Sequence, residues 1–400
     1  MVFQQPRMSS KILYMKRHHV ILFLLIIGII VVISLRSGYT RVTSTISYDS
    51  DYSSHQYHGF HDIQYIQQSF RTLIVKENAT RILLTGGAGF IGHHAAKAFL
   101  ERGDIVIIVD DMNDYYDNEI KWKRIAEIRD MYSSSKALFL VGDIANTTWM
   151  GLVFEVSRPT SIVHLAARAG VRPSIQDPLI YVHTNILGTT VLLHLAQKFN
   201  VSKFVYASSS SVYGKGKKQC FNEDDASDTP LSPYAATKRS CELLAANYNY
   251  LYNISTIGLR FFTVYGPSGR PDMATLTFID RIARGIPIDR YGLGTSSRDY
   301  TYIDDVVEGI QRALAYGVGN QVFNIGNGKP IALNLFIKTI GSLLNKSAVI
   351  KSFPDQLGDV PRTCANISLA KINIGYQPKT SIVEGLNQTV LWYLKNQMDE

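Results

Sequence analysis

The sequence predicts an α/β fold, with a doubly wound parallel sheet followed by a smaller C-terminal lobe. Short apolar segments alternate along the chain with longer segments whose apolar residues recur at helical spacing, as in a parallel sheet covered by helices. A glycine-rich turn joins the first such strand to the first helix. The 400 residues, 46% of them hydrophobic, are enough for one large two-lobed domain.

The stretch TGGAGFIG, residues 85–92, lies between a short strand and a helix, and DIVIIVDD follows as a second strand. Gly86 permits the tight turn, Gly89 lets the backbone approach a pyrophosphate, and Gly92 lets the helix pack on the strand. Asp110 ends the second strand, where a carboxylate binds a ribose hydroxyl and excludes the extra phosphate of NADP. This context predicts a Rossmann-type NAD site rather than a plain turn between strand and helix.

Further candidate cofactor residues lie at the start of this helix and at the ends of later strands, which line one crevice in a doubly wound sheet. Asp143 and Ile144 are expected near the adenine, and a loop cap is an equal role for Asp143. The residues after the strand SIVH are expected near the pyrophosphate. Beyond the glycines and Asp110, the candidates are Phe90, Ile91, Asp143, Ile144, Leu165, Ala166 and Ala167.

Tyr234 and Lys238 stand four residues apart at the start of a predicted helix, so both side chains leave the same face. The unperturbed pKa of tyrosine is about 10, so it is a poor base unless cations such as Lys238 and a nicotinamide ring favour the phenolate. The strand FVYASSSS ends in four serines, residues 208–211, whose hydroxyls suit the same substrate oxygen. Behind a dinucleotide site, this spacing predicts a catalytic couple rather than a surface pair.

The net charge of +8 does not indicate a nucleic-acid partner. Six positive charges precede the first acidic residue, at Arg7, Lys11, Lys16, Arg17, Arg36 and Arg41. The remaining body is close to neutral and carries no nucleic-acid motif, so we exclude that class of partner.

Residues 20–35, VILFLLIIGIIVVISL, form an apolar run behind a positive flank. As a helix the run is roughly 24 Å long, and we predict an uncleaved signal anchor in the lipid bilayer rather than a core helix or a cleaved signal peptide. Residues 1–19 are then a cytoplasmic tail and residues 36–78 a lumenal stem. The short span favours a thin membrane, so we expect a type II protein of the Golgi with a lumenal catalytic domain.

Sequons and cysteines also bear on a lumenal address. The sequons are at Asn78, Asn146, Asn200, Asn253, Asn345, Asn366 and Asn387, and those buried in the fold are not expected to be used. The cysteines Cys220, Cys241 and Cys364 allow at most one disulfide, with one thiol left over. Their spacing predicts neither a zinc site nor a disulfide framework, and no metal is expected.

The segments TGGAGFIG, YASSSSVYG and SPYAATK together resemble the extended short-chain dehydrogenase/reductase family, specifically its nucleotide-sugar epimerase branch, over about residues 80–396. FFTVYGP, GRPDMA and RDYTYIDDVV are similar to segments of the UDP-glucuronate 4-epimerases. By distance to the VYG tripeptide, the resemblance implies Ser209 as the catalytic serine, with the register open by one or two places. It also implies an NAD-binding lobe over residues 79–258, a mainly nucleotide-sugar-binding lobe over residues 259–400, and a homodimer.

A uronic acid substrate needs its carboxylate held. Oxidation at C4 makes a β-keto acid, which loses carbon dioxide when the carboxylate aligns with the carbonyl. An arginine binds a carboxylate bidentately, and hydroxyls add hydrogen-bond donors. The candidates for this grip are Ser210, Ser211, Thr263 and Arg270.

Two further positions of the C-terminal lobe follow from the resemblance. Arg298 is expected to hold the diphosphate, and a salt bridge to Asp299 or Asp304 is the alternative. The family usually has a tryptophan where this chain has Ser268, which leaves the packing of that loop open.

The resemblance implies 4-epimerisation of UDP-glucuronate to UDP-galacturonate, with tightly bound NAD that is regenerated in each cycle. In this reaction Tyr234 takes the C4 hydroxyl proton, and the hydride returns to the opposite face of a 4-keto sugar. UDP-glucuronate decarboxylase and a 4-epimerase of another UDP-sugar are the alternatives. Decarboxylases usually carry an acid before the VYG step, where this chain has Ser211. A catalytically silent NAD-binding protein is the remote alternative, since such proteins tend to lose the tyrosine or the lysine.

Overall fold

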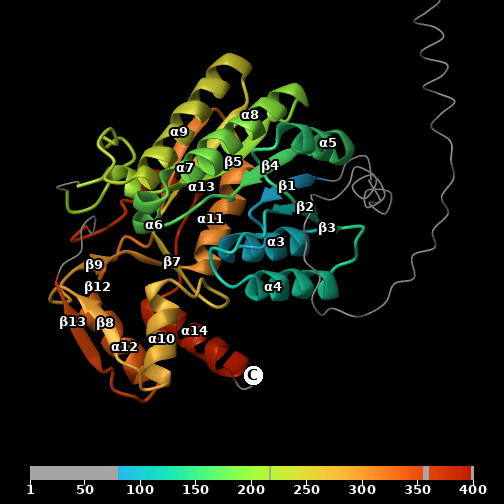
Figure 1. The fold of residues 1–400 in the computed structure, drawn as a ribbon. Coiled ribbons are helices and arrows are strands. Elements are labelled where there is room, and N and C mark those ends of the chain that lie inside the picture. The colour runs from blue at the N-terminus through green and yellow to red at the C-terminus, as the bar shows by residue number, and fades with distance from the viewer. Residues whose placement is uncertain (1–79, 216–217, 355–359, 398–400) are drawn as a thin grey trace, which may run out of the picture. The chain divides into compact units, whose positions relative to one another are not determined.

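The computed structural model describes residues 80–397, apart from residues 216–217 and 355–359. These residues form the α/β unit drawn in colour in Figure 1. The predicted tail, membrane anchor and stem, residues 1–78, lie outside the described residues.

Seven parallel strands form the central sheet, in the order β11-β6-β5-β4-β1-β2-β3. They are β1 Arg81–Thr85, β2 Ile105–Asp110, β3 Ala137–Val141, β4 Ser161–His164, β5 Lys203–Ser209, β6 Ser255–Phe261 and β11 Asn320–Ile325. The strand order reverses between β1 and β4, which confirms the doubly wound sheet. In such sheets the ligand crevice lies at this reversal, beyond the carboxyl ends of the strands.

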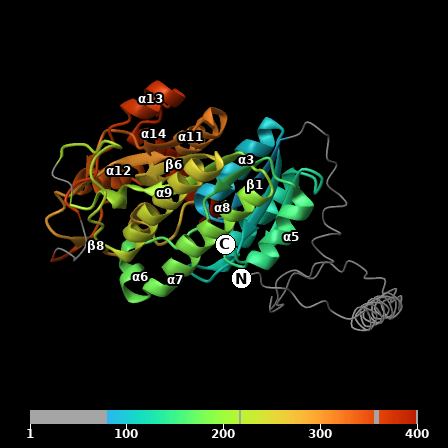
Figure 2. The ribbon, with the colours of Figure 1, turned by 90° about the horizontal axis from the view of Figure 1, so that it is seen from above.

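Helices cover both faces of the sheet (Figure 1), and alternate residues of β1 pack toward the two different layers. Ile82 and Leu84 of β1 pack with α3, α4 and α11, whereas Leu83 packs with α5, α8 and α9. Both faces of the sheet are therefore covered, which explains why its strands read as apolar runs. These helices are α3 Phe90–Arg102, α4 Asn118–Met131, α5 Thr147–Ser157, α8 Gly188–Lys198, α9 Pro233–Tyr252 and α11 Ile303–Tyr316. Figure 2 shows α8 and α9 side by side.

The smaller lobe contains three two-stranded sheets, in which β10 pairs with β7, β12 with β9 and β13 with β8. Its strands are β7 Thr263–Tyr265, β8 Ile288–Tyr291, β9 Ser297–Arg298, β10 Tyr300–Tyr302, β12 Ile331–Ala332 and β13 Ile350–Phe353. Its helices are α10 Ala274–Ala283, α12 Leu333–Leu343, α13 Ser368–Ile374 and α14 Ile382–Gln397. The chain after β6 thus builds this lobe, but it also returns to the main sheet through β11 and to a face of that sheet through α11.

One stretch of the described residues, Pro178–Lys198, is long and apolar enough to cross a membrane by length and composition. It joins α7 Pro178–Tyr181, the π-helical turn η1 Val182–Leu187 and α8, and more than half of its apolar part is buried inside the domain. Leu192 and Leu193 are fully buried in the core beneath the sheet. This stretch is therefore explained by the core packing of the fold.

Candidate active site

The glycine turn between β1 and α3 brings backbone segments into close contact. Gly86 has a φ of +73°, and a Cβ on it would lie 2.6 Å from the backbone N of Ala166. A Cβ on Gly92 would collide with the carbonyl of Gly86. In the part of the chain that the structure describes, no side chain caps the first turn of α3. Its N–H groups, with those of Phe90 and Ile91 among them, therefore suit a diphosphate.

Asp110 ends β2 beside this turn and is only 6% exposed. Its carboxylate accepts hydrogen bonds from the N–H groups of Ala88 (3.1 Å) and Met112 (3.0 Å). Burial raises the pKa of Asp110, and Lys121, whose Nζ lies 4.0 Å away, opposes that rise. A carboxylate fixed at the rim of the turn can accept from ribose hydroxyls and would repel a 2′-phosphate, so these residues fit NAD.

The other predicted cofactor residues lie at the carboxyl ends of the strands or at the start of α3. Asp143 caps its own loop by accepting from Ala145 N–H at 2.8 Å, and it also pairs with His183 Nε2 at 2.7 Å. Ile144 is buried, Leu165, Ala166 and Ala167 follow β4, and Gly89 is the N-cap residue of α3. The structure therefore shows the loop-cap role of Asp143 directly, while the backbone of Ala166 forms one wall of the glycine turn.

Tyr234 and Lys238 leave the first turns of α9, as the i, i+4 spacing predicts. The hydroxyl of Ser232 caps this helix, and a proline occupies its first position. Lys238 is 3% exposed, and its Nζ donates to the carbonyl of Ala207 on β5 at 2.8 Å. The ring of Tyr234 lies edge-on to that of Tyr181, with centroids 6.2 Å apart. The side chain of Lys238 thus meets the end of β5, while the ring of Tyr234 packs against α7.

The serine run divides between two roles at this strand end. Ser208 Oγ donates to Glu242 Oε1 at 2.5 Å and is committed to a buried ion pair between Glu242 and Arg260. Ser209 points to the opposite face, since strand side chains alternate. Its Oγ donates to Ser211 Oγ at 3.1 Å and accepts from the N–H of Ser211 at 3.2 Å. Ser210 begins the short 3₁₀ helix η2, Ser210–Tyr213. This division favours Ser209 as the catalytic serine.

Arg270 lies in the loop before α10, with its guanidinium carbon 5.1 Å from the centroid of the Tyr115 ring. Its Nε and Nη2 donate to the two carboxylate oxygens of Asp272, at 3.0 and 2.6 Å. Burial opposes the charge, but Asp272, with Tyr115 and Tyr234, raises the pKa of Arg270 above its ordinary value. Thr263 begins β7, and its N–H donates to a backbone carbonyl at 3.0 Å.

Three tyrosines gather around Arg270. Burial raises the pKa of Tyr181 most, and the charges of Tyr115 and Tyr234 raise it further. Burial also raises the pKa of Tyr115, and Arg270 opposes that rise. Sequence reasoning missed Tyr115, Tyr181 and Asp272 as site residues. Only Tyr115 carried a signal, because it stands five residues after Asp110 at the carboxyl end of a strand.

A buried histidine lies beneath the glycine turn. His164 Nδ1 hydrogen-bonds with Thr85 Oγ1 at 2.7 Å, and its Nε2 with Thr189 Oγ1 at 2.9 Å. Burial, and secondarily Lys238, lowers the pKa of His164 to about 3. The imidazole is therefore neutral, and it leaves the positive charge of this region to Lys238.

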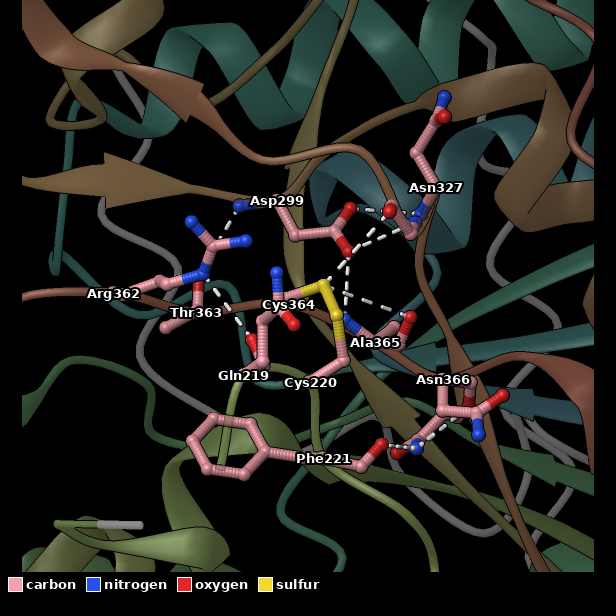
Figure 3. The surroundings of a disulfide bond; sticks show 12 residues. Gln219, Cys220, Phe221, Asp299, Asn327, Arg362, Thr363, Cys364, Ala365 and Asn366 are labelled. Carbon is pink, nitrogen blue, oxygen red and sulfur yellow. Dashed lines mark hydrogen bonds between the residues drawn. A yellow bond between two sulfur atoms is a disulfide. The ribbon is translucent and has the colours of Figure 1, made fainter. Parts of the chain in front are cut away.

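Cys220 and Cys364 form a disulfide (Figure 3). Cys241 is a buried free thiol. The prediction of at most one disulfide with one thiol left over is thus confirmed. Phe221 N–H donates to the carbonyl of Cys364 at 2.8 Å, so backbone pairing continues the link. The bond ties the chain after η2 to the segment before α13.

Asp299 lies next to this disulfide (Figure 3). Its carboxylate accepts from the N–H groups of Asn327, Gly328 and Ala365, at 2.7, 2.9 and 2.8 Å. Arg298 donates instead to the carbonyl of Ser297 at 3.0 Å. Within residues 80–397, Arg298 therefore forms no ion pair with Asp299 or Asp304, and the salt-bridge alternative for Arg298 is not realised.

The chain is similar to known proteins over nearly all of its described part. The model of the NAD dependent epimerase/dehydratase family matches residues 82–326. A UDP-glucuronate 4-epimerase of Thermodesulfobacterium geofontis is 43% identical over 315 residues, which cover 78% of this chain and 96% of that protein.

Two solved structures carry the comparison into three dimensions. The UDP-glucuronic acid 4-epimerase of Bacillus cereus, in complex with UDP-glucuronic acid and NAD, aligns with a TM-score of 0.74 and 34% identity, over 79% of this chain and 100% of that one. The UDP-glucose 4-epimerase of Thermotoga maritima, with UDP-glucose, aligns with a TM-score of 0.73 and 33% identity, over 80% and 100%.

Proposed function

We propose that this chain, which belongs to the NAD dependent epimerase/dehydratase family, converts UDP-glucuronate to UDP-galacturonate through a 4-keto intermediate. The observation that carries the proposal is the group of tyrosines between the base and the arginine. Arg270 lies against the ring of Tyr115, the ring of Tyr181 lies edge-on to that of Tyr234, and Tyr181 is close enough to feel the charges of both Tyr115 and Tyr234. A base and a carboxylate-binding arginine in one site suit a uronic acid sugar. The relatives with this named activity support the assignment.

In this reaction Tyr234 removes the C4 hydroxyl proton and later returns a proton to the same oxygen. Lys238 brings a positive charge to this site, and one of its N–H groups donates to the carbonyl of Ala207. The Ser209 hydroxyl holds the reacting oxygen. When bound, NAD accepts the hydride from C4 and returns it to the opposite face.

The site favours epimerisation over decarboxylation for two reasons. Arg270, together with the hydroxyls of Thr263, Ser210 and Ser211, would hold the substrate carboxylate out of line with the C4 carbonyl. In addition, two acidic side chains after the serine run are engaged elsewhere. Glu242 pairs with Arg260, and Glu223 accepts from the N–H of Asn324 at 2.8 Å. We assign the diphosphate to Arg298.

The test uses the purified full chain with UDP-glucuronate and no added NAD, followed by chromatographic separation of the products. UDP-galacturonate is the expected product, and it would also show that the cofactor is retained. UDP-xylose would favour the decarboxylase. If neither forms, other UDP-sugars would be tried, and NAD-loaded protein that turns over none of them would favour the silent binder.

We also propose that residues 20–35 anchor the chain in the Golgi membrane with the catalytic domain in the lumen. The apolar run and its basic flank support the orientation. The Cys220–Cys364 disulfide supports an oxidising compartment, because disulfides are rare in the cytosol. Protease protection of the domain in intact microsomes would test this location.

We propose a homodimer formed through α7, η1 and α9. Leu179 on α7 is 77% exposed, and Leu243 and Leu251 on α9 are 58% and 55% exposed. Helices α7 and α9 lie side by side, so these leucines are suited to a shared apolar surface. Light scattering of the wild type and of a Leu243→Glu variant would test this interface.

A further inference from the structure

Arg124, on α4, uses every N–H donor of its guanidinium in a buried position. The residue is 2% exposed. Its Nη1 donates to the carbonyl of Ala88 at 3.0 Å and to Tyr116 Oη at 2.8 Å. Its Nε donates to Ser268 Oγ at 3.1 Å, and its Nη2 donates to the carbonyls of Ser268 and Gly269 at 2.8 and 3.0 Å. Five donors thus meet five acceptors, which only a guanidinium can supply.

These acceptors belong to two loops that the fold brings together. Ala88 lies in the glycine turn, and its N–H is held by Asp110. Gly269 directly precedes Arg270 in the chain. One buried side chain therefore joins the glycine turn, residues 85–92, to the loop that carries the carboxylate-binding Arg270. We call this turn, together with Asp110, the cofactor cradle.

Two adjacent tyrosines form a second connection between Arg124 and Arg270. The ring of Tyr115 lies under Arg270, and the hydroxyl of Tyr116 accepts from Arg124. Arg270 is thus connected to Arg124, and through it to the cradle, in two ways. One is the backbone of Gly269, and the other is Tyr115 with its neighbour Tyr116.

Ser268 stands where the resemblance expects a tryptophan, and its contacts show how this loop is held in place. Its φ of +52° is left-handed, and its hydroxyl accepts from Arg124. A hydrogen bond to a buried cation therefore holds a position that a large ring would hold by packing. This makes the loop depend strongly on Arg124.

We propose that Arg124 is a positioning residue that keeps Arg270 in register with the cofactor cradle, and thereby keeps the 4-keto intermediate from losing carbon dioxide. The inference rests on the proposed function. In the side reaction the C5–C6 bond breaks and carbon dioxide leaves. The bonding pair forms the enolate of the C4 carbonyl, and a proton added at C5 gives a 4-ketopentose. The reduced cofactor then stays on the enzyme or reduces the ketone to a pentose.

The test compares full-length wild type with Arg124→Lys and with Arg129→Lys, an exposed arginine of the same helix. Each is incubated with UDP-glucuronate, and the ratio of UDP-pentose plus UDP-4-ketopentose to UDP-galacturonate is measured, together with bound NAD and Tm. We expect Arg124→Lys to raise this ratio about tenfold, because a lysine supplies three donors and cannot span both loops. Arg129→Lys should match the wild type.

A lower total rate with an unchanged product ratio would overturn the inference, since a merely structural role lowers both products together. If Arg124→Lys does not fold, Ser268→Gly decides in its place, because it suits the positive φ and removes only the acceptor for Nε. A rise in the ratio would support the inference, and no rise would overturn it. A wild type that forms no UDP-galacturonate would instead reject the proposed function, and the inference with it.

Discussion

Arg270 and Asp272 form a bidentate ion pair in the loop before α10, with Nε to Oδ1 at 3.0 Å and Nη2 to Oδ2 at 2.6 Å. The pair fixes the plane of the guanidinium over the ring of Tyr115. Asp272 thus occupies one edge of the guanidinium, and the group is already oriented for the carboxylate that we propose it binds.

Arg270→Met should remove the preference for an acidic sugar. We expect kcat/KM for UDP-glucuronate to fall about 100-fold, because a charge-assisted bidentate contact is lost. UDP-glucose, which has no carboxylate, should lose little. Kinetics with both substrates measure this preference. Equal losses for the two would show that Arg270 supports the loop rather than reading the carboxylate.

Tyr234→Phe should abolish epimerisation while leaving NAD bound. Loss of the acid–base group should lower kcat by at least about 10³-fold, and the ring contact with Tyr181 should persist. The matched control is Tyr248→Phe, further along the same helix. Single-turnover assays and the cofactor content of the purified protein measure the two effects. Substantial residual activity would assign the proton transfer to another group.

The glycine turn and the couple on α9 could be predicted because their chemistry is local in sequence. Gly86, Gly92 and Asp110 fall within one strand–helix–strand unit, and the spacing of Tyr234 and Lys238 is that of one helical turn. Such spacings place these residues together independently of how the rest of the chain folds.

Other site residues meet only through the tertiary fold. Arg124 and Ser268 are 144 positions apart in the chain, and they form a hydrogen bond because the tertiary fold brings the two lobes together. The register of the serine run also could not be predicted from the sequence. The contact between Ser208 and Glu242 in the structure shows which face of the strand each hydroxyl takes. The cysteine pairing likewise could not be chosen among three cysteines without the tertiary structure.

Reduction of the Cys220–Cys364 disulfide should destabilise the domain by about 2–5 kcal/mol, because the bond closes a long loop in the unfolded chain. Urea unfolding with and without reductant measures the difference. The Cys220→Ser/Cys364→Ser double variant should resemble the reduced wild type and be insensitive to reductant. Cys241→Ala retains the bond and should keep the full response. If reductant does not change the unfolding free energy of the wild type, the bond contributes nothing to stability.

Stability should rise with pH between about 4 and 6.5. Burial lowers the pKa of His93 to about 3, of His94 to about 4 and of His164 to about 3. In the unfolded chain each pKa is about 6.5, so the unfolded state binds more protons in this window. Lowering the pH from 6.5 therefore removes stability, and raising it above 6.5 adds nothing more from these groups.

His94→Gln isolates one of these groups. Glutamine can still donate to the carbonyl of Pro267, which His94 Nε2 contacts at 3.0 Å, but it does not titrate. The slope of unfolding free energy against pH should drop by up to about 1.4 kcal/mol per pH unit. Urea titrations at several pH values measure both slopes, and identical slopes would mean that His94 keeps an ordinary pKa.

If the domain is lumenal, glycans should be found where the fold leaves the sequon asparagine exposed. Asn200, Asn253 and Asn345 are exposed. Asn366 instead donates through Nδ2 to Asn222 Oδ1 at 2.6 Å, and Asn146 caps α5 through its side chain. A glycan is attached at Nδ2 and would break the contact to Asn222, so Asn366 should stay unmodified.

Mass spectrometry of peptides from chain made in secretory cells, after enzymatic release of glycans, measures occupancy at each site. Ser202→Ala should remove the glycan of Asn200 alone, which makes it the matched control. Occupancy of the exposed sequons with none at Asn366 would agree with a folded lumenal domain. Complete absence of glycans would contradict the lumenal location, because at least one exposed acceptor should meet the transferase.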